Sequence, residues 1–184
     1  MSPSPYGGPV SVDGWIDERI GALRGNAVAD RIMYAASSFG DDGRGWIACS
    51  LARSLRTEAP AHTFLRQMAW LGIESAIVNG PAKGAVRRDR PVHDRTHPHK
   101  LRRPSNSSFP SGHAASAATM ATLLSEDGLA PLWWGIALTV AASRVYVGVH
   151  HASDVLGGLA IGTAIGLAAR HIDLPLPVPG PDPA

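Results

Sequence analysis

Two nearly uninterrupted apolar runs, residues 129–142 and 155–169, limit the structures open to this chain of 184 residues. Runs of this length and composition predict helices. Strand signals are absent elsewhere in the chain as well. Ala and Gly are abundant, and such small residues suit closely packed helices. We therefore expect an all-α fold.

Helical spacing and stop signals predict six helices within one domain. The helices are expected at 27–38, 44–56, 61–79, 111–125, 131–146 and about 152–171. Gly80-Pro81 is a strong stop signal for the third helix, and a long loop then holds residues 83–109. The domain should span residues 15–173, after a disordered lead at 1–14 and before a Pro-rich extended tail at 174–184. Neither end is expected to carry chemistry.

The two apolar runs are each shorter than the roughly 18 to 20 residues of a membrane-spanning helix. Their polar ends, which would lie at a membrane surface, bring both runs to about the required length. Arg66 and Glu74 interrupt the helix at 61–79, so a soluble bundle with two hydrophobic central helices is the alternative. We expect a transmembrane bundle, with Trp133 and Trp134 at a membrane interface.

Positive charge is concentrated in one segment, although the formal net charge of the chain is only +2. Residues 83–103 contain eight Lys or Arg against Asp89 and Asp94, a net charge of +6, while the remainder carries −4. A nucleic-acid-binding protein would usually add base-stacking aromatic residues or a known reading motif, and this segment has neither. The expected partner is an anionic small molecule or a lipid headgroup. The single cysteine, Cys49, excludes an intrachain disulfide.

A turn of small residues, Pro110-Ser111-Gly112-His113, opens directly into an apolar run at 114–124. A helix start leaves backbone N–H groups unpaired and presents the positive end of the helix dipole, and both favour a bound phosphate. Gly112 lets an oxyanion approach the backbone, Ser111 offers a hydroxyl, and His113 can exchange a proton near neutral pH. The turn is a candidate phosphate site, although helices capped by Ser and Gly are common elsewhere.

Cations, a histidine and a carboxylate flank this turn at fixed spacings. The sequence contains Lys-x6-Arg-Pro at 83–91, Pro-Ser-Gly-His at 110–113 and Ser-Arg-x5-His-x3-Asp at 143–154. Over about residues 60–170 the chain resembles the type 2 phosphatidic acid phosphatases, whose superfamily includes bacterial acid phosphatases and vanadium haloperoxidases. No motif position departs from the family pattern. The resemblance implies a six-helix bundle, which is integral to the membrane in most small members.

The resemblance also implies the catalytic roles. His150 would attack phosphorus and form a phosphohistidine that water then hydrolyses. Asp154, at i+4 on the same helical face, can accept the other imidazole N–H and raise nucleophilicity. His113 would protonate the leaving oxygen and later activate water. Adjacent His151 is an alternative nucleophile, but the family spacing selects His150. Phosphate oxygens would be bound, without a metal ion or other cofactor, by Lys83, Arg90, Ser111, Gly112 and Arg144.

Two groups of loop residues have alternative interpretations. His93, His97 and His99, together with Asp94, could suggest a metal site, but their loop context favours solvated side chains. The remaining basic residues are either solvated or contact the substrate or anionic lipids. These residues are Arg87, Arg88, Arg95, Lys100, Arg102 and Arg103.

We expect a phosphohydrolase that acts on a membrane lipid phosphate. Small bacterial-type members of the family commonly serve envelope synthesis, which favours a polyprenyl-phosphosugar phosphate or a polyprenyl diphosphate. The alternatives are a glycerolipid phosphatase acting on phosphatidic acid or phosphatidylglycerophosphate, and a soluble non-specific acid phosphatase. A haloperoxidase and a non-catalytic anion-binding membrane protein are weaker alternatives. No obligate protein partner is implied.

The side of the membrane on which the site lies is a separate question. Short loops rich in Lys and Arg usually stay in the cytoplasm, which places the basic loop and the site inside the cell. Many family members work on the outer face, and a phosphate site must be basic wherever it lies. We expect an integral protein of the cell membrane with a cytoplasmic-facing site.

Overall fold

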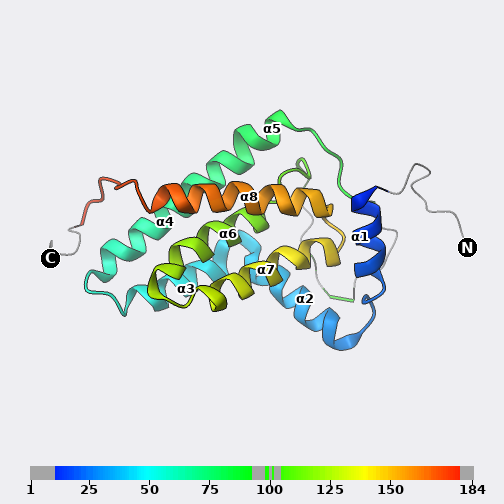
Figure 1. Ribbon diagram of the computed structural model, residues 1–184, viewed down its shortest axis with the longest axis horizontal. Coiled ribbons are helices and arrows are strands. Elements are labelled where there is room, and N and C mark those ends of the chain that lie inside the picture. Colours follow the sequence, from blue (N-terminus) through cyan, green and yellow to red (C-terminus); the bar gives the residue numbers. More distant parts are fainter. Residues whose placement is uncertain (1–10, 93–97, 100, 102–104, 179–184) are drawn as a thin grey trace, which may run out of the picture.

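The structure, a computed structural model, describes residues 11–92, 98–99, 101 and 105–178, and every regular element among them is helical (Figure 1). The all-α prediction is confirmed. The longer helices are α1 (Val12–Gly21), α2 (Ala27–Gly40), α3 (Arg44–Ser54), α4 (Pro60–Ile77), α6 (Gly112–Leu124), α7 (Ala130–Tyr146) and α8 (Ala152–Ala169). Short turns complete the order: η1 (Asp41–Gly43), η2 (Val78–Ala82), α5 (Lys83–Ala85) and η3 (Ser125–Asp127).

All six expected helices are present, and the chain adds α1 before them. Ser11, in the predicted disordered lead, is the N-cap of α1 and accepts a hydrogen bond from the Gly14 amide. The lead therefore differs from the prediction over residues 11–14, while residues 1–10 lie outside the described part of the chain. At the other end, residues 174–178 are non-helical, and residues 179–184 are likewise outside it.

The third expected helix ends close to its stop signal, but the chain does not leave the helical path at once. After α4, residues 78–82 form a wider turn with Pro81 inside it, and Gly80 departs from helical geometry. Proline lacks the N–H that a regular helix needs, so the turn opens here. The wider turn is followed by one short turn of helix, α5, which begins at Lys83 beyond the end of α4.

Helices α6 and α8 pack with unusually close backbones, and Figure 1 shows them side by side. The contact face of α8 carries glycines at every fourth position, Gly158, Gly162 and Gly166, which places them on one side of the helix. A methyl group on Gly162 would clash with the carbonyl of Ala115, and one on Gly158 with the carbonyl of Ser111. The glycines therefore bring the first turns of α6 and α8 together.

A tight turn joins α7 to α8 and reverses the chain. The carbonyl of Arg144 accepts hydrogen bonds from the amides of Val149 and His150, at 3.1 and 3.2 Å. Gly148 takes a positive φ of 70°, a conformation that glycine adopts without strain. This turn returns His150 to the end of α7, where Arg144 lies.

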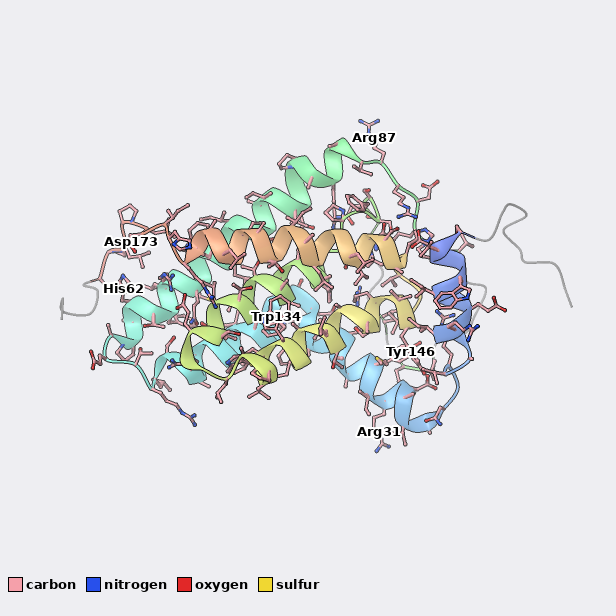
Figure 2. All side chains as sticks on the ribbon, viewed as in Figure 1. Arg31, His62, Arg87, Trp134, Tyr146 and Asp173 are labelled. Carbon is pink, nitrogen blue, oxygen red and sulfur yellow. The ribbon has the colours of Figure 1, made fainter. Side chains whose placement is uncertain are left out.

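The segment between α1 and α2 closes over the same end of α7. Arg24 donates to the carbonyls of Val145 and Tyr146, at 3.0 and 2.8 Å. The hydroxyl of Tyr146, labelled in Figure 2, donates to the Asp30 carboxylate at 2.6 Å and lies 3.0 Å from the Leu23 carbonyl. The two bonds from Arg24 satisfy the Val145 and Tyr146 carbonyls, which have no partner within α7 because they lie at its C-terminal end.

Among the described residues, α8 is the helix long and apolar enough to cross a membrane, a criterion that the core helix of a soluble protein also meets. Large apolar side chains nevertheless remain on the outside of the bundle. Leu132 and Leu138 of α7 and Leu156 and Leu167 of α8 are about half exposed. The two tryptophans expected at an interface, Trp133 and Trp134, pack partly buried against the core.

Candidate active site

A cavity of about 760 Å³ lies where α6 begins and the α7–α8 turn ends. Of the eight residues that the sequence singles out, five line it: Lys83, Gly112, His113, Arg144 and His150. The other three are adjacent, because Arg90 contacts His150, Ser111 is the N-cap of α6, and Asp154 lies beside the His150 ring. The structure therefore brings the three sequence motifs to one place.

His150 is buried, and its two ring nitrogens face different groups. Arg90 Nη1 lies 3.2 Å from Nε2, so the guanidinium can donate to that nitrogen. In a neutral ring the proton then sits on Nδ1, which lies 3.6 Å from Asp154 Oδ2. Burial, followed by the nearby charges of Arg90 and Arg144, lowers the pKa of His150 to about 4, although Asp154 opposes this shift. A neutral imidazole, which a nucleophile requires, is thus the form present at pH 7.

Asp154 is completely buried and held on both carboxylate oxygens. Oδ2 accepts from the Ser108 hydroxyl at 2.5 Å and from the His151 amide at 2.8 Å. Oδ1 accepts from Arg88 Nη1 at 2.7 Å. The backbone carbonyl of Asp154 also accepts from the Ser111 amide at 3.0 Å, which ties the α8 start to the candidate phosphate-binding turn. The carboxylate therefore has a fixed orientation beside His150.

Several buried donors at the cavity have no partner among the described residues. Arg144 is 1% exposed, and only its Nη1 is hydrogen-bonded, to the Ser37 hydroxyl. Its Nε and Nη2 and the Ser111 hydroxyl are unpaired. Leaving a buried charged donor unpaired is costly, so such groups usually mark a ligand position. An anion with several acceptor oxygens would satisfy all of them.

Lys83 and Arg90 are joined by a residue that the sequence motifs do not include. The Asn106 side-chain oxygen accepts from Arg90 Nη2 at 2.9 Å and lies 3.5 Å from Lys83 Nζ. Lys83 Nζ also donates to Asn79 at 2.7 Å. Burial, with the charge of Arg90, lowers the pKa of Lys83 to about 8, so the amine is still largely protonated at pH 7. The neutral amide of Asn106 positions both cations without neutralising them.

His113 has a carboxylate partner from a distant part of the chain. Its Nε2 lies 3.0 Å from Asp41 Oδ1, and Asp41 begins the short turn after α2. The sequence offers no signal for this pair, because the two residues are 72 positions apart and Asp41 belongs to an ordinary Gly-rich turn. A carboxylate at this distance can orient the ring and favours its protonated form, but burial has the larger effect, so the pKa of His113 lies below its ordinary value.

Arg88 is partly exposed and does not line the cavity that holds His150. Its Nη1 bonds Asp154 and the Ser153 hydroxyl, and its Nη2 bonds Asp13 of α1 at 2.7 Å. Asp13 also accepts from the Ser153 amide at 2.8 Å. Burial alone would raise the pKa of Asp13, but these hydrogen bonds from Ser153 and Arg88 lower it. The expectation that the chain end carries no chemistry missed this contact, because Asp13 belongs to no motif.

The remaining candidates are only partly within the described residues. Arg87 is exposed at the end of α5 and points away from the helices in Figure 2. His99 is also exposed and packs edge-on against the Tyr34 ring, with 5.2 Å between centroids. The other proposed metal-binding and basic residues of the loop lie outside the described part: His93, Asp94, Arg95, His97, Lys100, Arg102 and Arg103. Among the residues that the structure describes, no group of three or more His, Cys, Asp or Glu side chains could hold a metal ion.

Comparison with known proteins agrees with the motifs. The model of the PAP2 superfamily matches residues 64–174. A decaprenylphosphoryl-5-phosphoribose phosphatase of Mycolicibacterium smegmatis is 33% identical over 163 residues, which cover 86% of this chain and 84% of that protein. An undecaprenyl-diphosphatase of Sulfolobus acidocaldarius is 37% identical over 81 residues, 41% of this chain and 38% of that protein.

A solved structure has the same fold. The crystal structure of a transmembrane PAP2 type phosphatidylglycerolphosphate phosphatase from Bacillus subtilis superposes with a TM-score of 0.68 at 24% identity. The superposition covers 86% of this chain and 83% of that one. With the match of the family model over most of the chain, these findings show that the chain belongs to the PAP2 superfamily, the type 2 phosphatidic acid phosphatases that its motifs resemble.

Proposed function

We propose that this protein removes the terminal phosphate from a polyprenyl-linked lipid phosphate through a phosphohistidine intermediate. The observation that carries the proposal is the set of buried, unpaired donors of Arg144 in the same cavity as His150, with the unpaired Ser111 hydroxyl at the adjacent N-cap of α6. The names of the relatives, a polyprenyl-phosphosugar phosphate phosphatase and a polyprenyl diphosphatase, support this substrate class.

The first half of the reaction forms a bond to His150. Phosphate oxygens bind Arg144, Lys83, Arg90 and Ser111, together with the amides of the first turn of α6. The Nε2 lone pair of His150 attacks phosphorus, and the bond to the lipid oxygen breaks. His113 gives its proton to the leaving oxygen, and Asp154 stabilises the positive ring that results.

The second half regenerates the enzyme. His113, now neutral, takes a proton from a water molecule whose oxygen attacks phosphorus. The bond from phosphorus to Nε2 breaks, and inorganic phosphate leaves. His150 returns to its neutral form, and His113 is protonated again, so the cycle consumes one water and releases one phosphate. Asp41 is placed to stabilise His113 in its protonated state.

Apolar surfaces support a lipid substrate and a membrane setting. Beyond the cations, the cavity is lined by Ile47 of α3 and by Met68 and Leu71 of α4. Exposed leucines on α7 and α8 would face lipid acyl chains at little cost in free energy, whereas in water they would favour aggregation. These features favour a membrane-embedded bundle over the soluble alternative.

We predict phosphate release from a polyprenyl phosphosugar phosphate or a polyprenyl diphosphate by the purified protein, with vanadate as an inhibitor. His150→Ala should reduce the rate more than about 10³-fold, because it removes the proposed nucleophile. Asp154→Asn should leave a folded protein with a severely reduced rate. The measurement is inorganic phosphate released over a panel that also includes phosphatidic acid and phosphatidylglycerophosphate.

His151→Ala is the matched control, because Asp154 bonds the His151 backbone amide, which the substitution keeps. It should retain most activity. An inactive His151→Ala beside an active His150→Ala would show that the wrong histidine has been assigned. Preference for the glycerolipid phosphates would replace the polyprenyl substrate class while keeping the chemistry.

Activity should survive excess EDTA. Lys83, Arg90 and Arg144 supply the positive charge that a divalent ion would otherwise bring to the phosphate. Phosphate release is measured after dialysis against chelator and again after adding back individual divalent metals. Loss of activity that one metal restores would refute the cation-only mechanism and direct attention to the histidines of residues 93–99.

The active site is proposed to face the cytoplasm, because the basic segment around Lys83 and Arg87 lies at the site end of the bundle. After Cys49→Ser, a cysteine introduced at the exposed Asp89 should resist a membrane-impermeant maleimide in intact cells. It should react once the cells are permeabilised. Ready labelling in intact cells would place the site outside.

A further inference from the structure

A chain of ionic contacts runs from the catalytic cavity to the first turn of the N-terminal helix. Asp154 contacts Arg88 at 2.7 Å, and Arg88 contacts Asp13 at 2.7 Å. The Asp154 side chain is completely buried, Arg88 is 33% exposed and Asp13 is 17% exposed. The contacts therefore link a fully buried carboxylate to two partly exposed side chains outside the cavity.

The geometry divides the Asp154 carboxylate between two tasks. Oδ2 faces His150 Nδ1 and also accepts from Ser108 and the His151 amide. Oδ1 is bound by Arg88. Without Arg88, Oδ1 would be a buried anionic oxygen with no other hydrogen-bond partner among the described residues, which is costly. The carboxylate would then rotate so that Oδ1 could reach another hydrogen-bond donor. Such rotation would change the distance to His150.

Asp13 holds Arg88 in turn and closes the network on α8. Its carboxylate accepts from Arg88 Nη2, and from both the amide and the hydroxyl of Ser153, at 2.7 to 2.8 Å. The Ser153 amide belongs to the first turn of α8, where backbone N–H groups have no partner within the helix. A carboxylate there also suits the positive end of the helix dipole. One side chain of α1 thus caps the helix that carries Asp154.

We propose that Arg88 and Asp13 are positioning residues that fix the Asp154 carboxylate against His150, so that α1 is a working part of the active site. The inference rests on the proposed function. Neither residue lines the cavity that holds His150 and Arg144, although Arg88 also lines a second pocket, which it shares with Lys83 and Arg90. Both residues therefore act on turnover through Asp154. Arg88 in particular needs both arms of its guanidinium, because it bridges two carboxylates.

The test compares substitutions of Arg88 with Arg87→Ala, a matched control that removes the neighbouring, exposed guanidinium. Arg88→Ala should lower kcat by about 10- to 100-fold. KM should change by less than about 2-fold, because the phosphate-binding residues are untouched. Arg88→Lys, which keeps the charge but cannot bridge both carboxylates, should recover part of the loss. Asp13→Asn should lower kcat in the same direction by less, and Arg87→Ala should match the wild type.

A double-substitution series separates positioning from general stability. In an Asp154→Asn background, adding Arg88→Ala should lower kcat by less than about a further 2-fold, because the effects of substitutions within one hydrogen-bond network are not additive. Equal losses in both backgrounds, a kcat unchanged by Arg88→Ala and Arg88→Lys, or a loss confined to KM would overturn the inference. A wild-type protein that releases no phosphate from any lipid tested would instead refute the proposed function.

Discussion

The close approach of α6 and α8 is the contact on which the site depends. Glycines at 158 and 162 leave room for the backbone of the facing helix at Ser111 and Ala115. The first turns of the two helices therefore meet, and the Ser111 amide bonds the Asp154 carbonyl. One helix start supplies the candidate phosphate-binding turn and the other supplies Asp154, so in the proposed mechanism their separation sets the geometry of the reaction. The α7–α8 turn then places His150 between them.

Among the described residues, the cations Lys83, Arg90 and Arg144 form no direct ion pair with a carboxylate, although Glu74 lies near Lys83 and Asp41 near Arg144. Lys83 and Arg90 are linked by the neutral Asn106, and two nitrogens of Arg144 are unpaired. The carboxylates of Asp41 and Asp154 contact the two histidines instead. In the proposed mechanism this arrangement leaves positive charge available to the substrate and places negative charge beside the imidazole rings that become protonated during turnover. Arg88 adds a cation that is balanced by Asp13 and does not enter the cavity.

The sequence predicts local structure well and pairings between distant segments poorly. The bounds of the six expected helices are close to those observed, because apolar spacing and the Gly80-Pro81 signal act locally. The i+4 relation of His150 and Asp154 follows from helical geometry alone. By contrast, Asp13 and Asp41 meet their partners across about 70 residues, and no periodic pattern records such contacts. Adjacent Arg87 and Arg88 have the same chemistry in the sequence, and only the fold shows that one is exposed and the other joins the Asp154 network.

The most direct test of this account is to trap the enzyme during turnover with a radiolabelled terminal phosphate on the substrate. Rapid quenching at alkaline pH, followed by peptide mapping, should locate an acid-labile phosphoryl group on His150. The label should be absent in His150→Ala and should be chased by unlabelled substrate at a rate no slower than kcat. Turnover without a labelled histidine, or label on another residue, would contradict the account.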